Sequence, residues 1–201
     1  MPNVCVIFDG QGGPTSTVRC FQGNVASGVY SAVLGGQANT DQSTYSVIAG
    51  GKNNTGLSNS LYSSIVGGEL NRTFNAYTII GGGMCNTESS SSYSVIVGGC
   101  QNKVLFSSYS YLGSGNLNTI INAGGSSLIG GQSNRINDGK DNVINGGCFN
   151  TIFTSGIFLN EGSTILGGFN NRVGGPNSSV GGGFANCVLG TNQSIVAGGT
   201  S

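Results

Sequence analysis

The sequence predicts an all-β protein built as a parallel β-solenoid, with about twelve coils of roughly 16 residues each. Three observations lead to this prediction. A nine-residue pattern, S-x-[VIL]-x-G-G-x-x-N, recurs along the 201-residue chain. The position six residues before each closing Asn is aliphatic in every copy. Charged side chains make up only 7% of the chain, far below the usual share of a globular domain, while glycine contributes 38 residues.

A recurring asparagine closes each copy of the pattern. Successive Asn residues are 15 to 17 residues apart, with one longer step of 21 from position 150 to 171. A repeat this short fits one turn of a β-solenoid and not a pair of helices. We expect the side chains to form a structural ladder in which each amide donates to the next and tolerates left-handed backbone. The ladder comprises Asn39, Asn54, Asn71, Asn86, Asn102, Asn118, Asn134, Asn150, Asn171 and Asn186.

The aliphatic position of the pattern predicts the core. Branched side chains suit a pleated ladder, and stacking coil upon coil at about 4.8 Å packs each methyl surface on its neighbour. The predicted core ladder comprises Val33, Ile48, Ile65, Ile80, Ile96, Leu112, Leu128, Ile144, Ile165, Val180 and Val196. The Gly-Gly pair that follows predicts a sharp corner, because glycine allows positive φ and close backbone approach.

Two further columns divide the chain. Tyrosine stands nine residues before the Asn in six consecutive copies, at Tyr30, Tyr45, Tyr62, Tyr77, Tyr93 and Tyr109. Later copies instead carry an aliphatic residue two positions after the Asn, at Val104, Ile120, Ile136, Ile152, Val173 and Val188. We expect the tyrosines to be buried packing and not a sugar-binding stripe.

These columns set the predicted domain organisation. Residues 1–30 match the pattern poorly and are expected to form an N-terminal cap or attachment segment. Residues 31–201 form the solenoid, with a Tyr-stripe part at about 31–110 and an aliphatic two-strand part at about 103–201. The two parts are predicted to close their cores differently.

The opposite face of the predicted strand is too apolar to face water over many coils. It includes Val47, Val66, Val97 and Leu166. An exposed apolar patch of this length indicates an interaction surface. Burying it against two identical chains would also account for the low charge. We therefore expect a side-by-side homotrimer.

One repeat carries an insertion of about five residues, within positions 154–162. Insertions in a solenoid form outward loops. The apolar residues Ile157, Phe158 and Leu159 either fold back onto the rod or contact a partner, and the sequence leaves both open.

The sequence provides no candidate catalytic, cofactor-binding or metal-binding residues. There is no His, and the acidic residues are scattered. Asp138 and Asp141, with Lys140 between them, are expected to form a solvated loop. Seven cations balance seven acids, so we expect no nucleic-acid partner. No apolar run is long enough for membrane insertion.

Six cysteines lack a Cys-x-x-Cys motif. Cys5 and Cys20, and likewise Cys85 and Cys100, lie one period apart and are candidates for neighbours on adjacent coils. Free buried thiols are favoured over disulfides, because the start of the chain does not resemble a secretory signal and cytosolic thiols stay reduced.

The copies at residues 46–55 and 63–72 resemble the head repeats of trimeric autotransporter adhesins. They are still more similar to the Ser-Thr-Val-Gly-Gly-Gly-x-x-Asn-Thr arrays of related bacterial and of phage or viral fibre proteins. The resemblance covers about residues 31–201. It implies a left-handed parallel β-roll, three chains side by side, and a rigid surface projection that attaches to a host or matrix.

The sequence thus favours a non-enzymatic fibre or spike protein of a virus or phage, made in the host cytoplasm and exposed on the virion, with other capsid or fibre proteins as partners. The alternative is an adhesin head, extracellular or on a cell surface, that binds a host glycan or receptor. An ice-binding solenoid is disfavoured, because Arg72, Lys103, Arg135 and Arg172 interrupt the Thr column that follows the Asn.

Overall fold

The computed structural model describes residues 6–7, 17–19, 23–154, 161–190 and 193–200. These residues form strands, turns and bends. Helices are absent from these ranges, so none of them holds a helix that could cross a membrane. The predicted all-β class is confirmed, as is the stacking of parallel strands into a solenoid of about ten turns of roughly 16 residues.

The strands alternate between two sheets, which we call sheet A and sheet B. Sheet A contains β1 (Val6–Ile7), β2 (Thr17–Arg19), β4 (Ala32–Val33), β6 (Val47–Ile48), β8 (Ser64–Ile65), β10 (Ile79–Ile80), β12 (Val95–Ile96), β14 (Tyr111–Leu112), β16 (Ser127–Leu128), β18 (Val143–Ile144), β20 (Thr164–Ile165), β22 (Ser179–Val180) and β24 (Ile195–Val196). Sheet B contains β3 (Val25–Ala26), β5 (Thr40–Asp41), β7 (Thr55–Gly56), β9 (Arg72–Thr73), β11 (Thr87–Ser89), β13 (Lys103–Leu105), β15 (Thr119–Gly124), β17 (Arg135–Lys140), β19 (Thr151–Phe153), β21 (Arg172–Val173) and β23 (Cys187–Val188).

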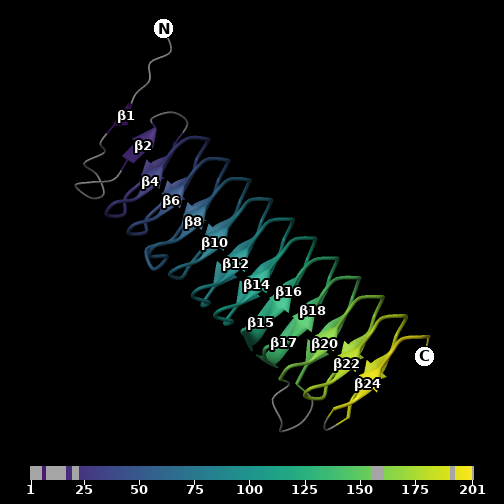
Figure 1. Ribbon diagram of the computed structural model, residues 1–201. Coiled ribbons are helices and arrows are strands. Elements are labelled where there is room, and N and C mark those ends of the chain that lie inside the picture. The colour runs from purple at the N-terminus through teal and green to yellow at the C-terminus, as the bar shows by residue number, and fades with distance from the viewer. Residues whose placement is uncertain (1–5, 8–16, 20–22, 155–160, 191–192, 201) are drawn as a thin grey trace.

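Each coil contributes one short strand to each sheet, and successive coils stack along one straight rod (Figure 1). Neighbouring strands within a sheet are parallel, except that β1 is antiparallel to β2. β2 pairs with β4 in the repeat register, so sheet A extends to the N-terminal side of residue 31. A third line of parallel bridges, beginning with Gln37 to Lys52, runs along the corner between the sheets.

The core lies between the sheets as two stacked rows. The residues predicted for the core ladder lie on sheet A directly above one another, as in the pairing of Ile48 with Ile65. All are at most 1% exposed except Val196, which is half-buried in the last described coil. In the C-terminal half, the second row on sheet B is aliphatic, from Val104 to Val188.

The second row changes its chemistry in the N-terminal half. The positions equivalent to Val104 hold Ala26, Asp41, Gly56, Thr73 and Glu88, all facing inward. The prediction that tyrosine closes the core of this half is wrong, because these small or polar side chains occupy that place instead. Tyrosine stands elsewhere, at a corner.

Candidate functional site

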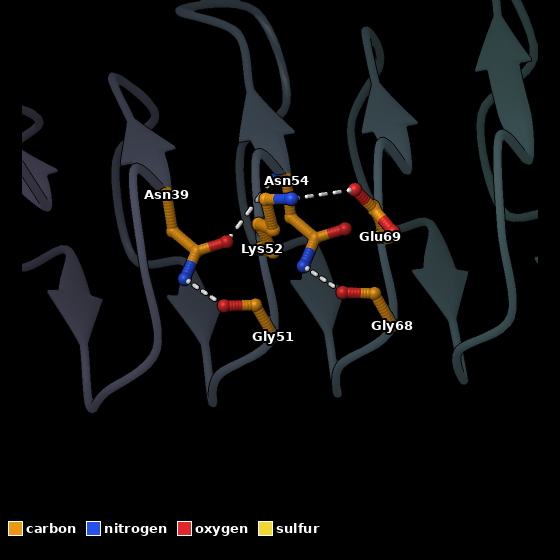
Figure 2. Close-up of polar contacts among 6 residues, drawn as sticks. All are labelled: Asn39, Gly51, Lys52, Asn54, Gly68 and Glu69. Atoms are coloured by element: carbon orange, nitrogen blue, oxygen red, sulfur yellow. Dashed lines mark hydrogen bonds and ion pairs between the residues drawn. The ribbon is translucent and has the colours of Figure 1, made fainter. Parts of the chain in front are cut away.

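The asparagine ladder forms the inner corner of the solenoid. From Asn39 to Asn171, each Oδ1 accepts the backbone N–H of the Asn one coil further on, at 2.9 to 3.0 Å. Each Nδ2 donates to the carbonyl of the glycine-corner residue four positions earlier and to a glycine carbonyl of the next coil. Asn54 donates in this way to Gly50 and to Gly68, and Figure 2 shows the bond to Gly68. All ten side chains are at most 7% exposed. Every buried amide atom is therefore satisfied.

This arrangement differs from the predicted amide-to-amide ladder. Only Asn171 and Asn186 also donate to the preceding Asn side chain, at 3.1 Å. The left-handed conformation lies on the residue before each Asn, with φ between 53° and 58°, and not on the Asn itself. The reason is that an amide bonded to three backbone groups of two coils is held at a fixed orientation, whereas the exposed preceding residue makes the turn.

The second glycine of each pair is required at the corner. Gly51 has φ +89°, and a Cβ added there would lie 2.1 Å from the carbonyl oxygen of Gly68. The first glycine, Gly50, has open space around the equivalent position. Two observations thus agree with the predicted corner. The backbone of Gly51 is left-handed, and the next coil lies too close to Gly51 for a side chain to fit.

The six tyrosines form an exposed ladder of stacked rings. Neighbouring ring centroids are 4.7 to 5.1 Å apart and the planes lie within 11° of parallel. The rings are 45 to 70% exposed, so the prediction of buried packing is wrong. The reason is the backbone: all six have φ between 56° and 60°, a corner conformation, and their rings lie against one another on the outside of the coil.

A signal for this corner is present in the sequence. The equivalent positions of later coils hold Gly125, Asp141, Gly162, Asn177 and Gln193, all with positive φ. Gly, Asp and Asn are the residues that adopt left-handed backbone most readily, whereas an aromatic residue there is strained by about 1–2 kcal/mol. The tyrosines therefore stand where a turn residue would be the easier choice.

The outward face of sheet A is a largely apolar strip, interrupted by small or polar residues such as Ser127, Asn145 and Ser179. Its large exposed side chains are between 36 and 57% exposed and lie in the two columns that flank the buried core ladder. They are Leu34, Val47, Val66, Ile79, Val97, Tyr111, Ile129 and Leu166. Ile195 extends this strip in the last described coil. We refer to these residues as the sheet A strip; the tyrosine ladder runs along its edge.

Two carboxyl groups lie in the core, both in the N-terminal half. Asp41 is fully buried. Its two oxygens share the single hydroxyl hydrogen of Ser46, at 2.7 and 2.8 Å from the hydroxyl oxygen, and Oδ1 accepts the N–H of Ser43 at 3.2 Å. A Cβ at Gly56 would come within 2.8 Å of its Oδ1, so the glycine of the next coil leaves room for the carboxyl. Burial raises the pKa of Asp41 to about 6, against the opposing effect of these hydrogen bonds.

Glu88 connects two coils. Its Oε2 accepts the N–H groups of Phe74 and Asn75 in the preceding coil at 3.0 Å, and its Oε1 accepts the N–H of Ser91 at 2.9 Å. Burial raises its pKa, and these backbone donors partly offset the increase. The scattered acids of the sequence therefore include two structural core groups. The sequence contained a signal for this burial, because Asp41 and Glu88 stand at the repeat position that Val104 occupies in a later coil.

From Lys52 onward, the other charged side chains that the structure describes are exposed or half-buried. Lys52 and Glu69, on successive coils, form an ion pair of 3.2 Å between half-exposed side chains (Figure 2). Asp138 and Lys140 lie within strand β17, so the predicted loop at 138–141 is wrong there. The strand extends through them because β17 pairs with β15 along its length, up to Gly124 with Lys140. Asn122 donates to Asp138 at 3.1 Å across these two strands.

Four cysteines fall in the described ranges, and all are free thiols. Cys85, Cys100 and Cys148 are half-buried and Cys187 is exposed, so the expected full burial is wrong. Cys100 pairs with Met84 and not with Cys85, because the two cysteines occupy adjacent columns of the repeat. Cys5 and Cys20 lie outside the described residues, as do the candidate contact residues Ile157, Phe158 and Leu159.

Among the residues that the structure describes, no three acidic or cysteine side chains gather closely enough to hold a metal ion. What this part of the molecule offers to partners is its long outward surfaces: the sheet A strip, the tyrosine ladder and the outer face of sheet B. No protein-family model matches the chain. A comparison with curated proteins finds no significant relative either.

Proposed function

We propose that the protein is a non-enzymatic structural rod that assembles side by side with two identical chains into a fibre or spike. The observation that carries the proposal is the sheet A strip. Its aliphatic side chains stay about half exposed in a single chain, in a row that runs nearly the length of the rod. Strips of this length are usually covered in the functional state.

The repetition of the strip from coil to coil indicates which molecule covers it. Most coils offer a similar shallow apolar surface, so a second copy of the rod matches it along most of its length. A closed symmetric assembly also covers the strip without leaving an apolar edge. A virus or phage particle is the setting that we propose, because the repeats resemble those of fibre proteins.

The test changes the strip without changing the fold. Asn145 already stands in one of its columns, so asparagine is compatible with sheet A. We expect Val97→Asn with Leu166→Asn to lower the solution mass of the assembly. The matched control, Val25→Asn with Leu189→Asn, alters two exposed aliphatic residues away from sheet A and leaves the mass unchanged. Equal masses for both double variants would contradict the proposal.

A second candidate function is supported by the tyrosine ladder. Six strained residues are retained where glycine or asparagine would fit, and their rings are exposed at a regular spacing. The rings cover one another's faces, and the ring edges that stay exposed offer an apolar surface that sugar rings can contact. The alternative is therefore an adhesin that binds a host glycan. Glycan-array binding that is lost in Tyr62→Asn and kept in Tyr62→Phe would support it, and an array without any bound glycan would contradict it.

A further inference from the structure

The outer face of sheet B carries a regular row of cations. The position after each ladder asparagine points outward, and Arg72, Lys103, Arg135 and Arg172 occupy it in every second coil. Thr87, Thr119 and Thr151 occupy the coils between them. Strand pairing fixes the row: Thr87 pairs with Arg72 and Lys103, and Thr119 with Lys103 and Arg135. Thr151 pairs with Arg135 and Arg172 in the same way.

The geometry of the row follows from the strand spacing. Parallel strands lie about 4.8 Å apart, so the cations repeat at roughly 9.6 Å and the row spans about 29 Å. All four cations are exposed, whereas the threonines between them are half-buried. The charges therefore project above a flat surface that carries hydroxyl groups.

The row carries unbalanced positive charge. Among the described residues, the salt bridge is the one between Lys52 and Glu69. None of the four cations of the row takes part in it. Arg135 donates to Asn137 at 2.8 Å, and the guanidinium of Arg172 lies 5.0 Å from the ring centre of Phe153. Both contacts orient the cation without an ion pair. The amide of Asn137 also donates to the carboxylate of Asp138, so one acid lies beside Arg135. Glu88 lies below the row, but it faces the core and is bonded to backbone N–H groups.

We propose that this face of sheet B binds an anionic polysaccharide that lies along the rod axis. A ligand that meets four cations over this distance is an extended polymer, and its charges must be sparse. Single-stranded nucleic acid carries a phosphate on every nucleotide, so its charges are denser than one per about 9.6 Å. A polysaccharide with one sulfate or carboxylate group per few sugar rings matches the spacing better.

The surface beside the cations suits sugar rings. Phe74 and Phe153 lie next to the row in the neighbouring outward column and are half-exposed. A hollow lined by Leu70, Arg72, Cys85 and Thr87 lies at its N-terminal end. Apolar faces with a few polar groups are typical of ligand sites. A second copy of this chain is not a suitable occupant, because the described outward columns hold no corresponding row of acids. The proposal does not depend on assembly through sheet A, which is a different face.

The test uses hyaluronan, which carries one carboxylate per disaccharide, as the anionic probe, with neutral dextran and single-stranded DNA as comparisons. The variant Lys103→Thr with Arg135→Thr removes two cations from the row. Threonine is the native residue in the coils between, so the fold should be kept. The matched control, Lys52→Thr with Lys140→Thr, removes the same charge elsewhere on the surface.

We expect the full chain to bind hyaluronan and not dextran. The row variant should lose about tenfold in affinity, and the slope of log K against log salt should fall by roughly half, because two of four charged contacts are lost. The control should change affinity less than about twofold. Equal losses in both variants, no hyaluronan binding by the unmodified chain, or tighter binding of single-stranded DNA than of hyaluronan would each overturn the proposal.

Discussion

At the level of single residues, one asparagine per coil joins two coils. Asn102 donates to the carbonyls of Gly98 and Gly115 at 2.8 and 3.0 Å and accepts the N–H of Asn118 at 3.0 Å. No other neutral side chain of this size combines two donors with an acceptor. Removing it would leave a buried N–H without a partner and two carbonyls short of a donor, which is expensive away from water.

We therefore expect Asn102→Ala to lower the free energy of unfolding by about 3 kcal/mol. The measurement is urea unfolding followed by circular dichroism. Asn116→Ala, an exposed asparagine at the same corner, is the control and should change stability by less than about 0.5 kcal/mol. A similar loss in both variants would show that the ladder bonds are not what holds the corner.

The buried Asp41 predicts an unusual dependence of stability on pH. Its folded-state pKa of about 6 lies above the ordinary value of 3.8, so the folded protein holds this proton more tightly than the unfolded chain does. Stability should then fall as pH rises from about 4 to about 6, by about 3 kcal/mol in total, and be flat for this group above that range. The raised pKa of Glu88 acts in the same direction.

Unfolding at a series of pH values measures this dependence. Asp41→Asn should flatten much of it and leave the part that comes from Glu88, whereas Asp141→Asn, at an exposed position, should leave the curve unchanged. Stability that rises with pH over this range in the unmodified protein would show that Asp41 is ionised and favourably bonded in the fold.

At the level of the corner elements, the two glycines of a pair have different roles. In the pair Gly82-Gly83, only Gly83 has φ +83° and would place a Cβ 2.0 Å from the carbonyl oxygen of Gly99. The left-handed backbone alone costs an L-residue about 1–2 kcal/mol, and the contact adds to this. We expect Gly83→Ala to lose more than about 2 kcal/mol in thermal unfolding and Gly82→Ala less than about 0.5 kcal/mol. Equal losses would show that the next coil moves away freely.

The elements also show what sequence periodicity can and cannot predict. The sequence period predicts the positions of the aliphatic ladder and of the glycine corner, because an aliphatic residue that recurs between small residues fits only the inside of a coil. The period does not say on which side of a corner a side chain lies. Periodicity alone therefore predicts the tyrosines inside, although the Gly and Asn residues at the same position of later coils indicate a left-handed turn.

The buried acids illustrate a second gap. Asp41 and Glu88 stand in the column that later holds Val104 and Ile120, but acids are usually exposed and suggest a surface position. Their burial depends on donors that only the folded coils bring together: Ser46 for Asp41, and the N–H groups of the preceding coil for Glu88. Such contacts form only when the coils are folded and stacked, so the sequence of a single repeat does not reveal them.

At the level of the whole molecule, the rod presents a different surface on each side. The sheet A strip is apolar, the tyrosine ladder runs along its edge, and sheet B carries the cation row. The three surfaces run in parallel because every coil repeats the same columns (Figure 1). We infer that one face serves assembly while another remains free for a ligand.

The solution mass of the unmodified chain tests this account most directly. Light scattering after size-exclusion chromatography, at micromolar concentration and physiological salt, should give three times the 20.2 kDa mass of one chain. A stable species of 20.2 kDa would contradict the account, because the sheet A strip would then face water along the whole rod.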